Sequence, residues 1–494
     1  MTKMTPTPAD GLPALDRAEL ARHFAYVGGA WVAGESNDLI KVTDPASGNV
    51  LGSVARLTGN DSRMAVDAAH AAFAGWAGLL PQERGVILRR WRDLMLENSE
   101  DLARIMTAEQ GKPISESRGE IEYAASFLEF YAEEARRPNI EGVTSHLPDA
   151  EVEIWREPVG VAGLITPWNF PSAMLTRKAG AALAAGCTVV AHPAAETPFS
   201  ALALAELGEQ AGLPAGVFNV VTGHAPEIVG AWMADTRVRA VSFTGSTDVG
   251  RLLYGQAAET IKRLVLELGG HAPFIVFDDA DMGSAVTEAI KAKFATSGQD
   301  CLGANRFFVE RDSYDAFCAL FAEATQSLTV GPGNTDPDIG PLINEKAVAK
   351  QEEHVKDALD RGARLLCGGK RHAAGPLFYE PTVLVDVPPD AKIMYEETFG
   401  PVAAIAAFDS EEEVIVRAND TEYGLVAYLH SQDPRRIYRA CRALSFGMVA
   451  VNRTKVTGAP IPFGGMKQSG IGREGSRLGL EAFTEVKYVC RDWA

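Results

Sequence analysis

The middle of the sequence alternates between two hydrophobic patterns. Four short apolar runs are each followed by a stretch with apolar residues at helical spacing. The runs are 161–166, 187–191, 218–221 and 240–244, and the helical stretches are 176–185, 201–211, 227–234 and 248–260. Short apolar strands that alternate with helices are typical of a parallel sheet covered on both faces. The pattern therefore predicts an α/β unit in this region.

The region before this unit has a different pattern. Residues 1–20 are polar and contain prolines, which predicts a loose lead-in. Short strands come next, and long amphipathic stretches follow them. The predicted strands are 31–32, 40–42 and 50–54, and the predicted helices are 61–77, 81–110 and 116–137.

A second α/β region begins near residue 273 and reaches almost to the end of the chain. Its predicted strands are 273–276, 307–309, 363–366, 382–384, 402–408 and 427–430, and its predicted helices are 282–297, 314–328, 345–361 and 411–419. Residues 141–157 predict a β-hairpin around a Pro-Asp turn, and residues 485–490 predict a last strand. The hairpin is a candidate interaction arm.

Composition and charge narrow the function classes. The 494 residues carry a formal net charge of −18, which argues against nucleic acids and anionic membrane surfaces as partners. No apolar stretch approaches the roughly twenty residues of a transmembrane helix, and the start lacks a secretory signal. The six cysteines are therefore expected to be reduced thiols in a cytoplasmic protein. Neither the cysteines nor the nine histidines have metal-ligand spacing, so no metal site is predicted.

The strongest candidate chemistry lies between Glu267 and Cys301. Glu267 stands in an apolar run before Gly-Gly, and desolvation there would raise its pKa toward that of a general base. Cys301 follows small residues that would let a substrate carbon approach its sulfur. We therefore hypothesise that both side chains face one pocket. The alternative is a strand-end acid and an ordinary buried thiol.

Four loops add weaker signals. The loop 165–171 contains Asn169, whose amide could stabilise an oxyanion or simply cap the next helix. The turn 243–250 links a strand to a helix with small residues, which suits phosphate binding or an ordinary turn, and it lacks the G-x-G-x-x-G fingerprint. The acids of 396–401 could accept from sugar hydroxyls or be solvated, and the glycine-rich stretch 462–470 could line a pocket or turn a corner.

These motifs occur in an order that resembles the aldehyde dehydrogenase superfamily from about Tyr26 to the C-terminus. The order is the Asn loop, the glycine turn, Glu-Leu-Gly-Gly, Gly-Gln-x-Cys, Glu-x-Phe-Gly-Pro and Pro-Phe-Gly-Gly. The stretches 176–180, 198–207 and 272–281 are most similar to succinate-semialdehyde dehydrogenases.

The resemblance implies a Rossmann-like cofactor domain, an α/β catalytic domain and a small β arm. The cofactor domain would comprise residues 20–138 and 159–267, and the catalytic domain residues 268–476. Residues 139–158 and 477–494 would form the arm that assembles a homodimer or homotetramer.

The resemblance also implies roles for individual residues. Cys301 would be the nucleophile, Glu267 would activate water, Asn169 would hold the oxyanion and Lys178 would be a site lysine near Asn169. The cofactor would be NAD or NADP. Its implied contacts are Ile165, Thr166, Pro167, Trp168, His192, Ala195, Gly223, Gly245, Ser246, Leu268, Glu397 and Phe399.

Two departures from the family pattern concern specificity. The family usually has Lys and Glu where this chain has His192 and Ala195. Without that Glu the site lacks a negative charge that would repel the 2′-phosphate of NADP. Protonated His192 could contact this phosphate. The sequence therefore permits NADP and does not exclude NAD. At the substrate's far end Arg177 matches one of two expected arginines, but Ala295 replaces the other. Replacement contacts could come from Arg453, Lys455 and Thr457, with Phe463 beside them.

The predicted activity is the oxidation of a short anionic semialdehyde, with succinate semialdehyde first. A sulfonated aldehyde such as sulfolactaldehyde, or a hydroxylated one, is the main rival. A CoA-acylating enzyme fits less well because it would not need Glu267, and a cysteine hydrolase without nicotinamide remains a different class. Gly303 stands where some relatives carry a second cysteine, so no disulfide switch is expected. Asp300 is expected to point away from Cys301, because its charge would oppose thiolate formation.

Overall fold

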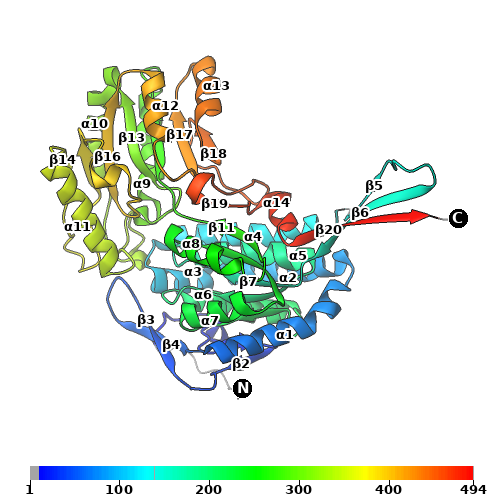
Figure 1. The fold of residues 1–494 in the computed structure, drawn as a ribbon. Helices are drawn as coiled ribbons and strands as arrows, with labels where there is room; N and C mark the ends of the chain where they lie inside the picture. Colours follow the sequence, from blue (N-terminus) through cyan, green and yellow to red (C-terminus); the bar gives the residue numbers. More distant parts are fainter. Residues whose placement is uncertain (1–10, 138, 493–494) are drawn as a thin grey trace.

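The computed structural model describes residues 11–137 and 139–492. Figure 1 shows two lobes, each built around its own sheet, and a narrow β arm that projects from the side of the lower lobe. The first ten residues of the predicted lead-in lie outside the described part, and residues Ala18–Leu20 form a short 3-10 turn.

The sheet of the first lobe has eight strands. They are β1 (Ala25–Val27), β2 (Ala30–Val32), β7 (Val161–Ile165), β8 (Thr188–His192), β9 (Phe218–Val220), β10 (Val238–Thr244), β11 (Arg263–Glu267) and β19 (Gly470–Ile471). Their order is β19-β11-β10-β7-β8-β9-β1-β2, and the five central strands are parallel. The predicted parallel α/β unit is confirmed, and a separate two-stranded sheet of β3 (Leu39–Thr43) and β4 (Val50–Ala55) precedes it.

Helices cover both faces of this sheet. One face packs against α1 (Gly59–Ala77), α7 (Ala225–Ala234) and α8 (Thr247–Ala257). The other packs against α5 (Pro171–Ala185) and α6 (Pro198–Ala211), and α2 (Pro81–Glu97), α3 (Ser99–Gln110) and α4 (Ile114–Glu134) pack on these two helices. The single helix predicted over 81–110 is wrong, because the chain breaks at Asn98, whose side-chain amide donates to the Leu94 carbonyl at 2.7 Å and ends α2.

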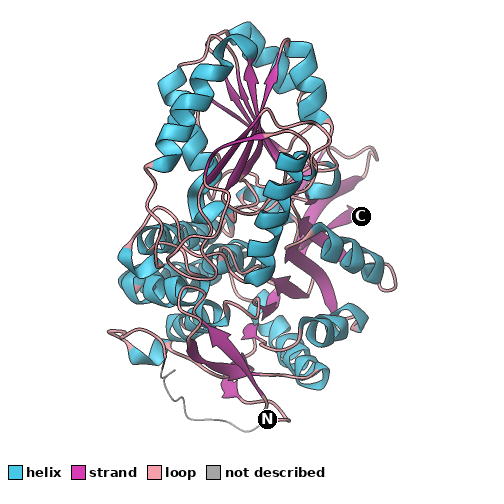
Figure 2. Ribbon diagram, turned by 90° about the vertical axis from the view of Figure 1, so that its left-hand side faces the viewer, coloured by secondary structure: helices cyan, strands magenta, loops and turns pink. Residues whose placement is uncertain are grey.

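The second lobe carries a seven-stranded sheet between two helical layers, as the upper part of Figure 2 shows. Its strands, in the order β14-β15-β16-β13-β12-β17-β18, are Arg364–Cys367, Thr382–Val385, Val402–Phe408, Ala304–Glu310, Ala272–Val276, Val426–His430 and Met448–Val451. Its helices are α9 (Met282–Phe294), α10 (Arg311–Gln326), α11 (Glu345–Asp360), α12 (Glu411–Asn419) and α13 (Pro434–Ala443). The sequence pattern did not predict β18 or α13.

The predicted hairpin and the last strand form one three-stranded sheet. In it β20 (Thr484–Asp492) pairs antiparallel with β6 (Ala150–Pro158), and β5 (Ile140–Val143) pairs with the other edge of β6. Side chains such as Val486 and Tyr488 on β20 are exposed. The predicted arm is therefore a real element of the fold.

The chain returns to the first lobe earlier than the predicted domain boundary at residue 476. Strand β19 pairs with β11, Leu266 opposite Ile471 and Glu267 opposite Gly470, and α14 (Ser476–Glu481) follows it. This return brings the glycine-rich stretch 462–470 to the carboxyl end of β11. The loops after β7, β10 and β11 open at that same edge, which is where open α/β sheets bind ligands.

No helix among residues 11–137 and 139–492 is both long and apolar enough to cross a membrane.

Gly111 gives a test of how the lobes are joined. It ends α3 at φ +93°, and a Cβ there would lie 2.6 Å from Pro341 Cγ and 2.8 Å from Pro45 Cγ. Gly111→Ala is expected to lower the free energy of unfolding by about 2–4 kcal/mol, through left-handed strain and overpacking together. Urea or thermal unfolding measures the change.

Two other glycines separate these causes. Gly212 has φ +95° with open space around it, so Gly212→Ala reports strain alone, about 1–2 kcal/mol. Gly75 lies within α1 with open space, so Gly75→Ala is expected to be neutral or stabilising by about 0.5–1 kcal/mol. Equal effects at all three positions would contradict the packing role of Gly111.

Candidate active site

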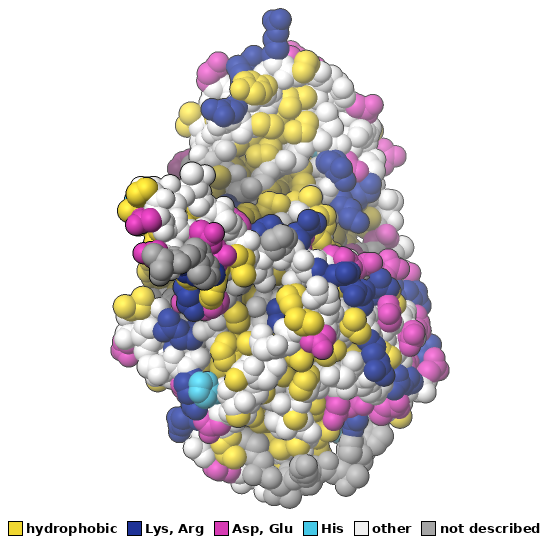
Figure 3. Space-filling view, turned by 90° about the vertical axis from the view of Figure 1, so that its right-hand side faces the viewer, with side chains coloured by type: hydrophobic (Ala, Val, Ile, Leu, Met, Phe, Trp, Pro, Cys, Tyr) yellow, Lys and Arg dark blue, Asp and Glu magenta, His cyan; other side chains and the backbone are white. Residues whose placement is uncertain are grey.

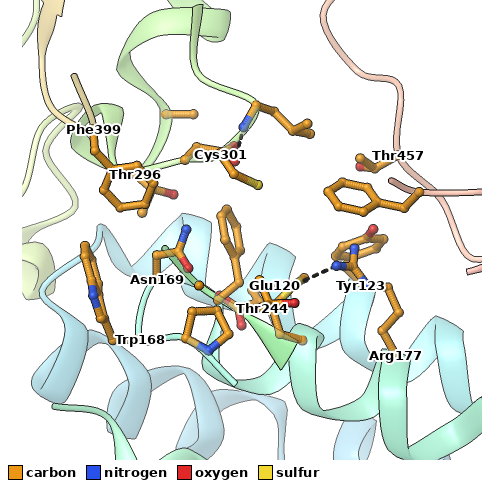
Figure 4. Close-up of a pocket in the computed structure, with 18 of the residues that line it drawn as sticks. Glu120, Tyr123, Trp168, Asn169, Arg177, Thr244, Thr296, Cys301, Phe399 and Thr457 are labelled. Carbon is orange, nitrogen blue, oxygen red and sulfur yellow. Dashed lines mark hydrogen bonds between the residues drawn. The ribbon is translucent and has the colours of Figure 1, made fainter. Parts of the chain in front are cut away.

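A cavity of about 540 Å³ lies between the lobes, where the loops after β7, β10 and β11 face the second lobe. Figure 3 shows the face that carries the arm, with hydrophobic side chains in a hollow between the lobes and Lys and Arg side chains beside it. The first lobe contributes residues from α4, α5 and the three strand ends, and the second lobe contributes the stretches 295–302, 397–399 and 455–463. Cys301 and Asn169 both line the cavity (Figure 4).

The segment that presents Cys301 has a strained backbone. Thr296 and Ser297 adopt φ values of +50° and +58°, and Gly298 follows at +73°. Non-glycine residues keep such angles only where contacts over-determine them. Here the Glu116 carboxylate accepts from the Thr296 backbone N–H at 3.0 Å, and the Ser297 hydroxyl donates to the Gly340 carbonyl at 3.0 Å. The segment is therefore clamped from both lobes.

Asn169 is held beside this segment rather than at a helix end. Its side-chain amide donates to the Gln299 carbonyl at 2.9 Å, and its backbone carbonyl accepts from Lys112 Nζ at 2.6 Å. The alternative that Asn169 caps the next helix is wrong, because Glu120 accepts from the first free N–H groups of α5 at 3.0 and 3.1 Å. The oxyanion-donor role stays a prediction.

Asp300 does not point away from the thiol, so that expectation is wrong. Its Oδ1 accepts from the Leu302 backbone N–H at 2.9 Å, a local turn that folds the carboxylate back over the intervening Cys301. Burial raises the pKa of the Cys301 thiol well above its ordinary value, and the Asp300 charge raises it further, while Arg177 lowers it. The free thiol is therefore mostly protonated at neutral pH.

Glu267 is buried behind the cavity and does not line it. Among the described residues neither of its carboxyl oxygens has a hydrogen-bond partner. Burial and the charge of Glu474 raise its pKa well above the ordinary value, while Arg177 lowers it. A Cβ added at Gly464 would lie 2.8 Å from Glu267 Oε1, so the carboxyl group faces that loop. The structure therefore does not bring Glu267 and Cys301 into one pocket in this side-chain arrangement.

Lys178 is buried, and its place as a site lysine near Asn169 stays a prediction. Its ammonium contacts Glu474 and donates to the hydroxyls of Ser242 at 3.1 Å and Thr244 at 2.7 Å. Lys112, which the sequence reasoning did not single out, contacts the Asn169 backbone carbonyl. Position in the chain could not reveal this contact, because it depends on tertiary packing.

Several site residues were missed by the sequence reasoning. Glu116, Glu120 and Tyr123 line the cavity from one face of α4, and Glu474 pairs with both Arg177 and Lys178. The helical spacing of the three α4 residues was a usable signal, because residues three and four apart share a face.

Seven predicted cofactor contacts line one end of the cavity. They are Pro167, Trp168, Gly245, Ser246, Leu268, Glu397 and Phe399. Trp168 and Phe399 meet edge to face with ring centroids 5.5 Å apart, on the left of Figure 4. Gly245 and Ser246 lead into the N-terminus of α8, and Glu397 accepts from the Gly270 N–H at 2.8 Å. A helix N-terminus and a glycine backbone that a ligand can approach suit the phosphates of a dinucleotide, and an acid suits its sugar hydroxyls.

The other predicted cofactor contacts lie outside the cavity lining. Ile165 and Thr166 are buried at the end of β7, Ala195 is exposed, and a Cβ at Gly223 would lie 2.6 Å from the Leu57 carbonyl oxygen. His192 is buried, and its Nδ1 donates to the Val221 carbonyl at 2.8 Å.

Burial lowers the pKa of His192. The ring is therefore neutral at pH 7, which removes the charge that the predicted 2′-phosphate contact needed.

The opposite end of the cavity is cationic. Arg177 donates through Nε to Glu474 at 2.7 Å, and its guanidinium carbon lies 4.0 Å from the Phe463 ring centroid. Its Nη1 is buried and, among the described residues, has no hydrogen-bond partner. Lys455, Thr457 and Phe463 also line the cavity, but Arg453 is exposed and outside the lining.

The described residues contain no group of three or more His, Cys, Asp or Glu side chains that could hold a metal ion.

The electrostatic coupling of Asp300 and Cys301 can be measured directly. Asp300→Asn keeps the acceptor for the Leu302 N–H and removes the charge, so the pKa of the Cys301 thiol is expected to fall. The rate of iodoacetamide alkylation at pH 7 should rise by about threefold or more. Mass spectrometry of the Cys301 peptide follows the reaction, and exposed Cys490 in the same digest is the internal control. An unchanged pH profile at Cys301 would show that the carboxylate does not act on the sulfur.

Comparison with known proteins agrees with this geometry. The model of the "Aldehyde dehydrogenase family" matches residues 31–489. The chain is 53% identical to the non-phosphorylating aspartate-semialdehyde dehydrogenase of Halomonas elongata, over 96% of this chain and 97% of that protein. It is 51% identical to the NADP(+) succinate-semialdehyde dehydrogenase of Escherichia coli (strain K12), over 96% of this chain and 99% of that one. A solved succinate-semialdehyde dehydrogenase from Burkholderia pseudomallei superposes with a TM-score of 0.96 at 50% identity, covering 97% of this chain and 100% of that one. The chain belongs to the aldehyde dehydrogenase family.

Proposed function

We propose that this protein oxidises a short anionic semialdehyde to the carboxylic acid with NAD or NADP, without CoA. The observation that carries the proposal is one cavity that is lined by Cys301 and by Arg177, whose Nη1 has no hydrogen-bond partner among the described residues. An aldehyde with an anionic tail matches both groups at once.

In the first step the Cys301 thiolate attacks the aldehyde carbon and gives a thiohemiacetal. The side-chain amide of Asn169 and the backbone N–H of Cys301 would donate to its oxyanion. The bond between Asn169 and the Gln299 carbonyl fixes the amide in advance, which is how such donors stabilise developing charge.

A bound nicotinamide cofactor supplies the two-electron oxidation that converts the thiohemiacetal into a thioester. Trp168 and Phe399 would hold the nicotinamide end, and Gly245 and Ser246 at the N-terminus of α8 would hold phosphate. The buried acid Glu397 would accept from a ribose hydroxyl. Because His192 is neutral, it contributes no charge to the choice between NAD and NADP.

Glu267 would act as the base that removes a proton from water as the water attacks the thioester. Its raised pKa suits that role, but its carboxyl group must first rotate away from the Gly464 loop toward Cys301. A CoA-acylating enzyme would not need this base, so Glu267 favours hydrolysis to a carboxylate. Lys178 would act indirectly, by holding Glu474 and thereby Arg177.

The substrate's tail would bind between Arg177, Lys455 and Thr457. Relatives at about half identity act on succinate and aspartate semialdehydes according to their names, which supports a short anionic class. Succinate semialdehyde is our first candidate, and a hydroxylated or sulfonated short aldehyde such as sulfolactaldehyde is the second. A cysteine hydrolase that needs no nicotinamide is the alternative class.

The arm of β5, β6 and β20 would assemble a homodimer or homotetramer, because exposed apolar side chains such as Tyr488 lie on it. Light scattering on the purified protein distinguishes these two states from a monomer. A catalytic thiol also suits the reducing cytoplasm, where we place the protein.

The nucleophile and the base are tested by two variants. Cys301→Ala should lower aldehyde oxidation by about 10³-fold or more with the fold intact by circular dichroism. Glu267→Gln should slow thioester hydrolysis by about 10²-fold and leave a rapid burst of reduced cofactor equal to the enzyme. Equal slowing of burst and steady state would exclude the base role. Ester cleavage that persists without nicotinamide, with no aldehyde oxidation, would favour the hydrolase.

Arg177 and Lys455 test recognition of the tail. Arg177→Lys should lower kcat/KM for succinate semialdehyde by about tenfold or more and leave a neutral aldehyde such as butanal nearly unaffected. Lys455→Gln is the matched variant, because it removes a cation from the cavity wall without disturbing Glu474. An equal decrease in kcat/KM for both aldehydes would show that these cations do not recognise the anionic tail.

A further inference from the structure

The loop 452–457 of the second lobe forms part of the cationic end of the cavity. Its residues Lys455 and Thr457 line the cavity, and Figure 4 shows Thr457 on the same side as Arg177. Within residues 11–137 and 139–492 the ammonium group of Lys455 forms no ion pair and no hydrogen bond. This ammonium group is therefore available to a ligand in the cavity.

The side chains of this loop alternate between two environments. Lys455 and Thr457 face the cavity. Val456 packs against the hydrophobic core of the second lobe, and Thr454 bonds to helix α9. Such alternation is that of an extended chain, in which a shift of one residue would exchange the two faces. The loop must therefore be held in one register to present its cation and its hydroxyl group to a ligand.

Glu288 of α9 holds the loop in this register. Its carboxylate accepts from the Thr454 backbone N–H at 2.7 Å, and its backbone carbonyl accepts from the Thr454 hydroxyl at 2.8 Å. Among the described residues, Thr454 is the only one of positions 453–456 that forms a hydrogen bond. One acid therefore supplies all the polar contacts that fix this part of the loop.

The helix that carries Glu288 also leads to the nucleophile segment. Ala295, which follows α9, lines the cavity but brings no charge to it. Although burial opposes it, hydrogen bonds from Lys291 and Thr454 lower the pKa of Glu288, so its carboxylate is ionised at neutral pH. A hydrogen bond to an ionised acceptor is stronger than one between neutral groups. The helix thus contributes to the cationic end of the cavity through the loop that it anchors.

We propose that Glu288 is a positioning residue that sets the register of the loop 452–457. Through Thr454 it places Lys455 and Thr457 at the anionic tail of the substrate. This inference rests on the proposed function, because that function assigns the tail to this end of the cavity. Glu288 does not line the cavity itself, so it acts on recognition only through the loop.

Kinetics with two aldehydes test this role. Glu288→Ala should raise KM for succinate semialdehyde by about fivefold or more and change kcat by less than about twofold, because the loop contributes to binding and not to the thiol chemistry. KM for butanal, which has no anionic tail, should stay within about twofold of the wild-type value. An equal rise in KM for both aldehydes would show general damage to the cavity and would overturn the proposal.

Two further variants separate the hydrogen bond from the charge. Glu288→Gln keeps an acceptor for the Thr454 N–H and should hold KM for succinate semialdehyde within about twofold of wild type. Lys291→Ala is the matched control and should leave KM unchanged, because Lys291 is exposed and pairs with the other carboxylate oxygen of Glu288 at 2.7 Å. An increase in KM for Glu288→Gln as large as that for Glu288→Ala would count against a positioning role.

A double-mutant cycle shows whether Glu288 acts through Lys455. In the Lys455→Gln background, Glu288→Ala should raise KM for succinate semialdehyde by only about twofold or less, since the cation that it positions is gone. The same rise in both backgrounds would contradict the proposal. Thr454→Val removes only the hydroxyl bond to Glu288, and it should raise KM for succinate semialdehyde by about twofold or more, with butanal unaffected. Circular dichroism and thermal unfolding check that each variant is folded.

Protection of Cys301 tests the same role without turnover. Butanoate has the substrate's tail without its aldehyde and should slow the alkylation of Cys301 by iodoacetamide. Glu288→Ala should raise the butanoate concentration needed for half protection by about fivefold or more. Protection by butanamide, the neutral analogue, should be the same in the variant and the wild type.

The outcomes separate this inference from the proposed function. If none of the aldehydes is oxidised, the proposed function fails, and protection by butanoate then decides the positioning role by itself. If succinate semialdehyde is oxidised but Glu288→Ala changes neither its KM nor the protection by butanoate, only the positioning role is overturned.

Discussion

Two buried carboxylates on one face of α4 hold the active site together. Glu120 satisfies the first N–H groups of α5 and pairs with Lys112, which in turn holds the backbone of Asn169. Glu116, one helical turn earlier, binds Thr296 in the strained segment before Cys301. A single rigid helix therefore fixes both the candidate oxyanion donor and the segment that carries the nucleophile. Unpaired burial of either acid would be strongly unfavourable, so the contacts persist.

Without a ligand, the electrostatic environment of the cavity disfavours the ionised forms of the candidate nucleophile and base. Burial and Asp300 keep the Cys301 thiol protonated, and burial and Glu474 do the same for Glu267. Although burial opposes it, Lys178 and Arg177 lower the pKa of Glu474, so that acid carries the charge in the network behind the cavity. A resting site of this kind limits side reactions of the thiol, and activation then depends on what the ligand brings.

Family membership and substrate choice depend on different residues. The motifs around Asn169, Glu267 and Cys301 resemble those of aldehyde dehydrogenases, and the family model and relatives at about half identity match nearly the whole chain. Near the cavity this chain departs from the expected pattern, since Ala295 stands where an arginine is expected. Small changes in such a pocket alter which tail is accepted while the reaction itself is kept.

The sequence by itself determined the α/β class, the hairpin and last strand of the arm, and the identities of the motif residues. These signals are local, because hydrophobic period and turn chemistry are set by neighbours in the chain. It also indicated Arg177 and Thr457 as candidate binding residues, and both line the cavity. The directions in which the buried side chains point could not be predicted from such local signals. Whether Glu267 faced the cavity and whether Lys112 reached the Asn169 carbonyl depended on contacts between segments far apart in the chain.

Only the tertiary structure decided those points, and the reason is the same in each case. A buried charge takes the orientation in which its hydrogen bonds and counter-charges are best satisfied, and those partners come from other elements. Lys112 donates to the Asn169 carbonyl and pairs with Glu120 of α4, and Lys178 pairs with Glu474, which follows the return of the chain through β19. Local sequence patterns identified the candidate residues, and contacts between charged groups from distant segments set their orientation.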